Sequence, residues 1–200
     1  MSNVRTSFEG ETFNHRILWF IVGRQLKHAT ENPPGAMHDH LVAMVFAFHA
    51  FEAYLNFIGE KLAPDVWANE RQYFGRGEYQ GFAGKLKKVL ELVGMTAPEK
   101  TTRPYSTVWL LKNLRDQIAH ARTEKYAFAV DHAPDDQLTL ALNLFGGLVT
   151  SENAEMAEAD IEAFADQIQE LARPKVSGIV GDRAFRGMLS FGTHHGTVAA

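Results

Sequence analysis

Apolar residues recur with helical spacing along most of this 200-residue chain. The clearest segment is 37–62, where large apolar side chains repeat at alternating intervals of three and four residues. This seam consists of Leu41, Met44, Phe48, Phe51, Leu55, Ile58 and Leu62. Further apolar residues flank the seam, and a helix that is apolar around much of its circumference is usually buried. We therefore expect 37–62 to be the central helix of a bundle.

Four other segments are predicted to complete an all-α bundle of about five helices. They cover about 12–30, 78–93, 105–122 and 151–173, and a short helix is expected within 64–74. The side chains that the first helix should bury are Phe13, Ile17, Phe20 and Ile21, with Trp19 and Val22 broadening the stripe. Proline and glycine at 33–35 end this helix.

The last helix is expected to begin at Ser151, whose hydroxyl can cap the first free backbone N–H groups. Glu152 and Glu155 in its first turn are favourable to the helix dipole. Its apolar stripe consists of Ala157, Ile161, Phe164, Ile168 and Leu171.

Two regions depart from the helical pattern. Residues 124–144 alternate between apolar and polar positions around Pro134, which predicts a small β-hairpin inserted before the last helix. Residues 175–200 are rich in glycine and are interpreted as a C-terminal tail, or as an arm that docks on this bundle or on a partner. Residues 1–10 are expected to be a loose tail, and residues 1–174 a single domain.

Composition and charge narrow the function. The chain has no cysteine, which excludes disulfides and thiolate metal sites, and we expect no cofactor or metal. The net charge is -4, so any contact with nucleic acid must come from a local basic patch. Lys85, Lys87, Lys88 and Arg103 could guide RNA or could form an ordinary solvated face. The longest apolar run is too short to span a bilayer and no signal peptide is evident, so we expect a cytoplasmic protein.

The helix over 105–122 carries a charged group near its end. Arg115 and His120 are five positions apart, which is about 140° of rotation on an ideal helix. His120 therefore points away from the core together with Asn113 and Asp116. A guanidinium binds phosphate through a planar fork of donors, and an imidazole can transfer a proton near neutral pH. The alternative is that these residues form only a solvated helix face.

The central helix carries a second polar group. His49, Glu52 and Asn56 fall within about 60° of one another on the helical wheel. A carboxylate near an apolar seam is costly unless it is paired, and Arg115 is the partner that we expect for Glu52, with His120 or His49 next. The alternative is that Glu52 extends to solvent or forms a purely structural ion pair.

Three segments resemble the motifs of prokaryotic HEPN-like proteins. They are Phe51-Glu52-Ala53-Tyr54-Leu55-Asn56, Lys85-Leu86-Lys87-Lys88-Val89-Leu90 and Leu111-Lys112-Asn113-Leu114-Arg115-Asp116-Gln117-Ile118-Ala119-His120. The likeness covers about residues 40–122. It implies a helical bundle that forms a face-to-face homodimer and, in active members, a metal-independent endoribonuclease that leaves a cyclic phosphate.

The same resemblance implies roles for individual residues. Arg115 would bind the scissile phosphate and His120 would transfer the proton. Asp116 stands where asparagine is frequent, and Glu52, Asn56, Asn113 and His49 would support the site. RNA, and an antitoxin or nucleotidyltransferase protein, are the partners expected for a toxin, defence or RNA-processing nuclease. The alternatives are a non-catalytic helical interaction module and a nucleotide- or RNA-binding module.

Overall fold

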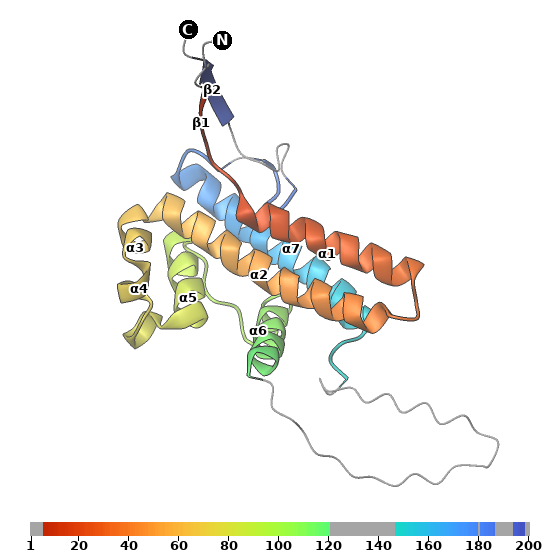
Figure 1. Cartoon of the computed structure of the whole chain (residues 1–200). Helices are drawn as coiled ribbons and strands as arrows, with labels where there is room; N and C mark the ends of the chain where they lie inside the picture. The colour runs from red at the N-terminus through yellow and green to blue at the C-terminus, as the bar shows by residue number, and fades with distance from the viewer. Residues whose placement is uncertain (1–5, 121–146, 180, 187–193, 199–200) are drawn as a thin grey trace, which may run out of the picture.

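The computed structural model describes residues 6–120, 147–179, 181–186 and 194–198, and these residues are mainly helical (Figure 1). The α-helices are α1 (Asn14–Glu31), α2 (Ala36–Leu62), α3 (Pro64–Ala68), α4 (Glu70–Tyr73), α5 (Gly81–Val93), α6 (Tyr105–Ala119) and α7 (Ser151–Ala172). Two short 3-10 helices are η1 (Gly77–Tyr79) and η2 (Arg173–Lys175), and the strands are β1 (Thr6–Gly10) and β2 (His194–Val198). The mainly helical structure of this part of the chain is consistent with the predicted all-α class, although the sequence analysis did not predict the β1–β2 pair. The hairpin predicted at 124–144 lies outside it.

The central position of α2 is confirmed. This helix contacts α1, α7, α5, α6 and α3. Five seam residues, Met44, Phe48, Phe51, Leu55 and Ile58, are fully buried. In Figure 1, α1 and α2 run side by side, and α7 packs behind them. The C-terminal end of α6 points away from α1, so within α6 the residues near this end lie farthest from α1.

By length and composition alone, α2 is also the one helix in the described residues that could cross a membrane. Its most apolar 18-residue window has a mean hydropathy of 1.6, and 50% of that window is buried. The core helix of a soluble bundle passes the same test, so this is weak evidence for a membrane span. The sequence analysis considered only the longest uninterrupted apolar run and therefore did not consider this helix as a candidate membrane span.

The buried face of α1 differs from the predicted one. Ile17 and Phe20 are 38% and 60% exposed, whereas His15 and Arg16 are each 2% exposed. Trp19 and Val22 belong to the buried face, and Phe13 is buried just before the helix begins. The helix is therefore rotated from the predicted orientation, and it packs a His–Arg pair inward while leaving an apolar pair in water.

Helix α7 follows its predicted apolar stripe except at the two ends. Ala157, Ile161, Phe164 and Ile168 are fully buried, but Leu171 is 39% exposed. Thr150 rather than Ser151 is the N-cap residue, because its hydroxyl accepts a hydrogen bond from the backbone N–H of Asn153 at 3.1 Å. The Ser151 hydroxyl instead donates to the Glu155 carboxylate at 2.9 Å.

The first and the last segments that the structure describes pair with each other. Strand β1 pairs with β2 in antiparallel register from Thr6 opposite Val198 to Gly10 opposite His194. Residues 6–10 are thus a strand, and the prediction of a loose tail is wrong for them. Strand β1 depends on its pairing with the distant segment β2, because a lone strand leaves its backbone N–H and C=O groups without hydrogen-bond partners.

Residues 181–186 form an arm that docks on the bundle. The Phe185 ring stacks on Trp19, with centroids 4.2 Å apart and planes at 13°. The backbone N–H of Ala184 donates to Asp166 Oδ1 on α7 at 2.7 Å. Of the two interpretations of the C-terminal region, the arm on its own bundle describes these six residues.

A buried carboxylate fastens α6 to α7. Asp160 on α7 accepts hydrogen bonds from Arg103 Nε at 2.7 Å and from an Arg103 terminal nitrogen at 2.9 Å. The hydroxyl of Thr107 also donates to Asp160. Burial alone would raise the pKa of Asp160, but the hydrogen bonds from Arg103 and Thr107 outweigh burial and hold this pKa below its usual value. This connection anchors the N-terminal end of α6 to α7.

Candidate functional site at the end of α6

Arg115 lies against the central helix. Its guanidinium carbon is 5.1 Å from the centroid of the Phe48 ring, and its Nε is buried without a hydrogen-bond partner in the described residues. The side chain remains 31% exposed. A guanidinium over the face of an aromatic ring is attracted to the ring, and this contact restricts where its outer N–H groups lie. Phe48 therefore acts as a platform that positions Arg115.

Asp116 compensates the charge of Arg115. Its carboxylate forms ion pairs with Arg115 at 2.9 Å and with Lys112, one turn earlier, at 2.5 Å. The hydrogen bond from Lys112 is the main reason that the pKa of Asp116 lies below its usual value, and the charges of Arg115 and His120 lower it further. Two cations thus share one carboxylate, and the cluster keeps a net positive charge.

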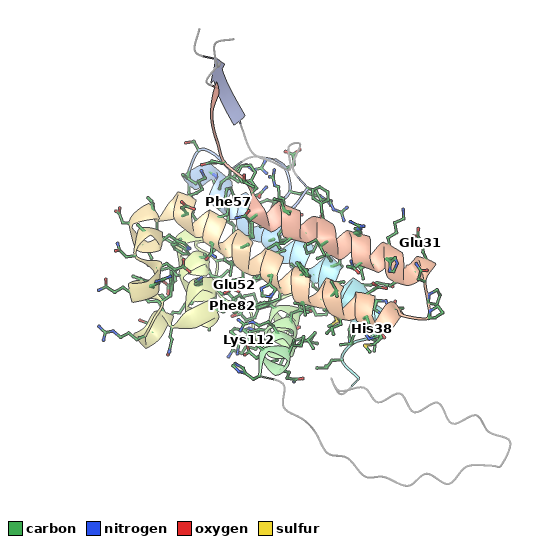
Figure 2. All side chains as sticks on the ribbon, viewed as in Figure 1. Glu31, His38, Glu52, Phe57, Phe82 and Lys112 are labelled. Atoms are coloured by element: carbon green, nitrogen blue, oxygen red, sulfur yellow. The ribbon has the colours of Figure 1, made fainter. Side chains whose placement is uncertain are left out.

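The expected pairing of Arg115 with Glu52 is wrong. Arg115 pairs instead with its chain neighbour Asp116, while its guanidinium lies over the Phe48 ring. Within the described part of the chain, Glu52 forms neither a hydrogen bond nor an ion pair, and it is half-buried. Figure 2 labels Glu52 on α2 and Lys112 on α6 on the same side of the molecule, below α1 in this view.

His120 is the C-cap residue of α6 and is exposed. Its backbone N–H donates to the Asp116 carbonyl at 3.0 Å, which closes the last turn of the helix. An exposed imidazole at this position is accessible to a bound molecule and can exchange a proton with it. Asn113 is exposed on the same face, two turns before His120.

The polar residues of α2 have their own local contacts. The half-buried His49 ring lies near the rings of Phe48 and Phe46, at centroid distances of 5.8 and 6.5 Å. Asn56 Oδ1 accepts a hydrogen bond from Trp67 Nε1 on α3 at 3.4 Å. Asn56 is thus turned toward α3, and the structure does not connect it to Arg115 or His120.

The basic residues expected to guide RNA are mostly neutralised. Lys85 pairs with Glu70, Lys87 with Glu78, Lys88 with Glu91 and Arg103 with Asp160. Paired cations of this kind produce a weaker field at the surface than free charges do. The end of α6 is therefore the more promising basic site.

No protein-family model, curated protein or solved structure matches the chain. The likeness to HEPN-like proteins thus stays a prediction that rests on the motif residues. In the described residues, no group of three or more His, Asp or Glu side chains is placed to hold a metal ion.

Two members of the site were missed by the sequence analysis. Lys112 could have been found, since it lies four positions before Asp116 and such pairs meet on a helix surface. Phe48 was recognised only as a core residue, because nothing local distinguishes a core ring from one that supports a guanidinium. Together, the residues place one oriented cation, one carboxylate and one accessible imidazole along less than two turns of helix.

Proposed function

We propose that the chain is a metal-independent endoribonuclease of the HEPN-like type that acts as a homodimer in the cytoplasm. The observation that most supports this is the pair of accessible groups at the end of α6. Arg115 is oriented by Phe48, and His120 ends the helix about one turn further on. A cation for the phosphate and an imidazole for the proton are the groups that this reaction needs.

In the proposed reaction, Arg115 binds the scissile phosphate and His120 takes the proton from the ribose 2′-hydroxyl. The 2′-oxygen attacks phosphorus, the bond from phosphorus to the 5′-oxygen breaks, and a cyclic phosphate forms. The departing 5′-oxygen needs a proton. His120 of a second copy would supply it, which is the reason for proposing a symmetric dimer.

The proposal is tested by incubating the purified full-length chain with mixed RNAs, with and without EDTA. We expect cleavage in both conditions, and fragments with cyclic phosphate ends. Arg115→Ala and His120→Ala should each lower the rate by about 100-fold or more, as loss of an oriented donor or of a general base does. Arg71→Ala and His38→Ala, exposed residues on other helices, are the matched controls.

Intact RNA in every condition would refute the nuclease proposal. Cleavage by the Arg115 and His120 variants at the same rate as by the wild type would refute it too. Light scattering of the same samples tests the dimer separately. If the chain is a monomer that still cuts RNA, the dimer proposal is wrong and the nuclease proposal stands.

A non-catalytic interaction module is the second candidate. The observation that favours it is the bridge that Asp116 makes between Lys112 and Arg115, because an arginine already paired is typical of a structural network. On this proposal, His120→Ala lowers dimer stability or the melting temperature, and RNA is not cut. RNA or nucleotide binding without cleavage, or a protein partner of the antitoxin or nucleotidyltransferase class, would belong to this candidate.

A further inference from the structure

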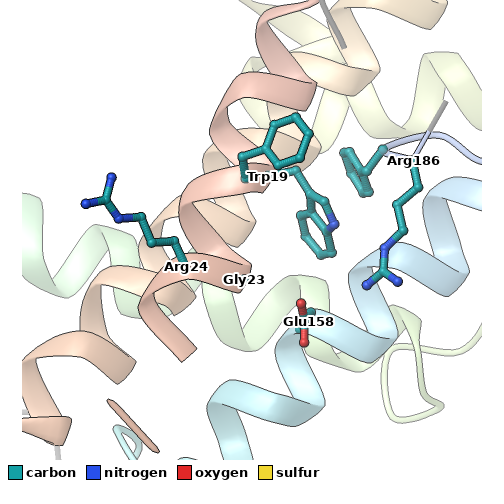
Figure 3. Close-up of a pocket in the computed structure, with 7 residues that line it drawn as sticks. Trp19, Gly23, Arg24, Glu158 and Arg186 are labelled. Atoms are coloured by element: carbon teal, nitrogen blue, oxygen red, sulfur yellow. The ribbon is translucent and has the colours of Figure 1, made fainter. Parts of the chain in front are cut away.

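A pocket of about 400 Å³ lies between α1, α7 and the docked arm (Figure 3). Helix α1 contributes Trp19, Phe20, Gly23 and Arg24, and α7 contributes Glu158. The arm closes the remaining side with Phe185 and Arg186. None of these residues belongs to the group at the end of α6.

Glu158 is the one carboxylate of this pocket, and its charge is poorly compensated. Within the described residues it forms no hydrogen bond and no ion pair within 4.0 Å. Burial raises its pKa, and the nearby carboxylates of Glu162 and Glu155 raise it further. Arg186 opposes these effects only in part, because its Nε is engaged by Glu162 Oε1 at 2.8 Å.

The walls around this carboxylate are aromatic. Phe185 stacks on Trp19, so these two rings form one continuous surface. The Phe20 ring is 60% exposed beside them. Figure 3 shows the guanidinium of Arg24 directed away from the pocket, on the far side of α1. A cation that enters the pocket therefore meets ring faces and a carboxylate, and the opposing charge is that of Arg186, which is paired with Glu162.

Gly23 leaves the space in front of Glu158 open. A Cβ atom at position 23 would lie 3.7 Å from Glu158 Oε1, which is an ordinary contact distance. The helix would tolerate alanine here, but the added methyl group would occupy the space that a ligand needs beside the carboxylate. A glycine in the middle of a helix is otherwise unfavourable compared with alanine.

We propose that this pocket binds a small organic cation, namely a primary amine carried on an apolar aryl or alkyl stem. The ammonium pairs with the Glu158 carboxylate, and the stem packs on the rings of Phe20 and Trp19. An anion is disfavoured, because of the two lining arginines Arg24 is directed away from the pocket and Arg186 is already paired with Glu162. The volume suits a ligand of about ten non-hydrogen atoms.

The test is calorimetric titration of the full-length chain with phenethylamine at neutral pH, where its amine is charged. Phenethyl alcohol, similar in size and neutral, is the matched ligand. We expect a Kd of about 1 mM or tighter for the amine, and at least about tenfold weaker binding of the alcohol. No heat with the amine, or equal affinity for the two ligands, overturns the proposal.

Two variants locate the site. Glu158→Gln keeps the shape and removes the charge, and should weaken amine binding by about tenfold or more. Gly23→Ala keeps the charge and narrows the pocket, and should weaken binding of both ligands. Glu152→Gln, exposed in the first turn of α7, is the control and should leave the affinity within about twofold.

Unchanged amine affinity in Glu158→Gln overturns the proposal. If circular dichroism shows that Glu158→Gln unfolds at a lower temperature than the wild type, the amine affinity of Gly23→Ala is the test instead. Unchanged affinity in Gly23→Ala would then overturn the proposal. Because the two sites share no residue, amine binding and RNA cleavage can fail independently.

Discussion

The buried histidine of α1 predicts how stability depends on pH. His15 is 2% exposed and lies among aromatic rings, with Phe57 at 4.9 Å and Tyr54 at 5.5 Å between centroids. Burial and, to a smaller extent, the charge of Arg16 lower its pKa from 6.5 to about 3, although a hydrogen bond to the backbone of Ala184 opposes both effects. The folded chain therefore keeps His15 neutral at pH values where the unfolded chain binds a proton.

The sign and size of the effect follow from this difference. Stability from neutral His15 is complete above about pH 6.5 and is lost as the pH falls from there toward 3, because protons favour the unfolded chain. Each pH unit well inside this window costs about 1.4 kcal/mol. Between pH 7 and pH 5, the free energy of unfolding should fall by about 2 kcal/mol from this one group.

Urea unfolding at pH 7, 6 and 5 measures this slope. His15→Phe keeps a ring in the core but cannot titrate, so its slope should be smaller than that of the wild type by about 2 kcal/mol over the same range. His38→Gln changes an exposed histidine on α2 and should keep the wild-type slope. Parallel curves for the wild type and His15→Phe would refute the assignment of a buried neutral imidazole.

Three further predictions concern the arm, the connection of α6 to α7 and the candidate site. Phe185→Ala should lower the free energy of unfolding by about 3–5 kcal/mol in urea titrations, because the ring is 2% exposed and stacks on Trp19. A loss below about 1 kcal/mol would mean that the arm does not dock on the bundle. Asp160→Asn should cost about 1–3 kcal/mol in the same assay, since the exposed Arg103 guanidinium can return to water, and no loss would contradict the bridge. Asp116→Asn should raise RNA affinity roughly fivefold in a binding titration by releasing Arg115, and unchanged affinity would argue that Arg115 does not contact phosphate.

The central helix could be predicted from the sequence because its buried residues repeat at helical intervals within one continuous segment. Met44, Phe48 and Phe51 follow helical spacing and are fully buried. Because other helices cover α2 on several sides, the prediction did not depend on deciding which face of this helix is buried. The long helices were found for the same reason. The exact N-cap at Thr150 was not, because two adjacent hydroxyl residues can each serve and only the chain direction entering the helix decides.

Long-range packing accounts for what the sequence could not show. The spacing of Ile17 and Phe20 predicts a buried stripe, but the arm brings Phe185 onto Trp19 and Ala184 onto His15, which favours the opposite rotation of α1. No local signal connects residues so far apart in the chain. The candidate site shows the same limit, because Arg115 and His120 were found by motif, whereas the support from Phe48 required the crossing of α2 and α6.

The most direct test of the proposed function is the rate of RNA cleavage in EDTA by the wild type, His120→Ala and the His38→Ala control, with each protein shown to be folded by its melting temperature. We predict cleavage by the wild type and the control, fragments with cyclic phosphate ends, and a loss of about 100-fold or more in His120→Ala at an unchanged melting temperature. Equal rates in all three proteins, or no cleavage by the folded wild type, would contradict the proposal that the end of α6 is a nuclease site.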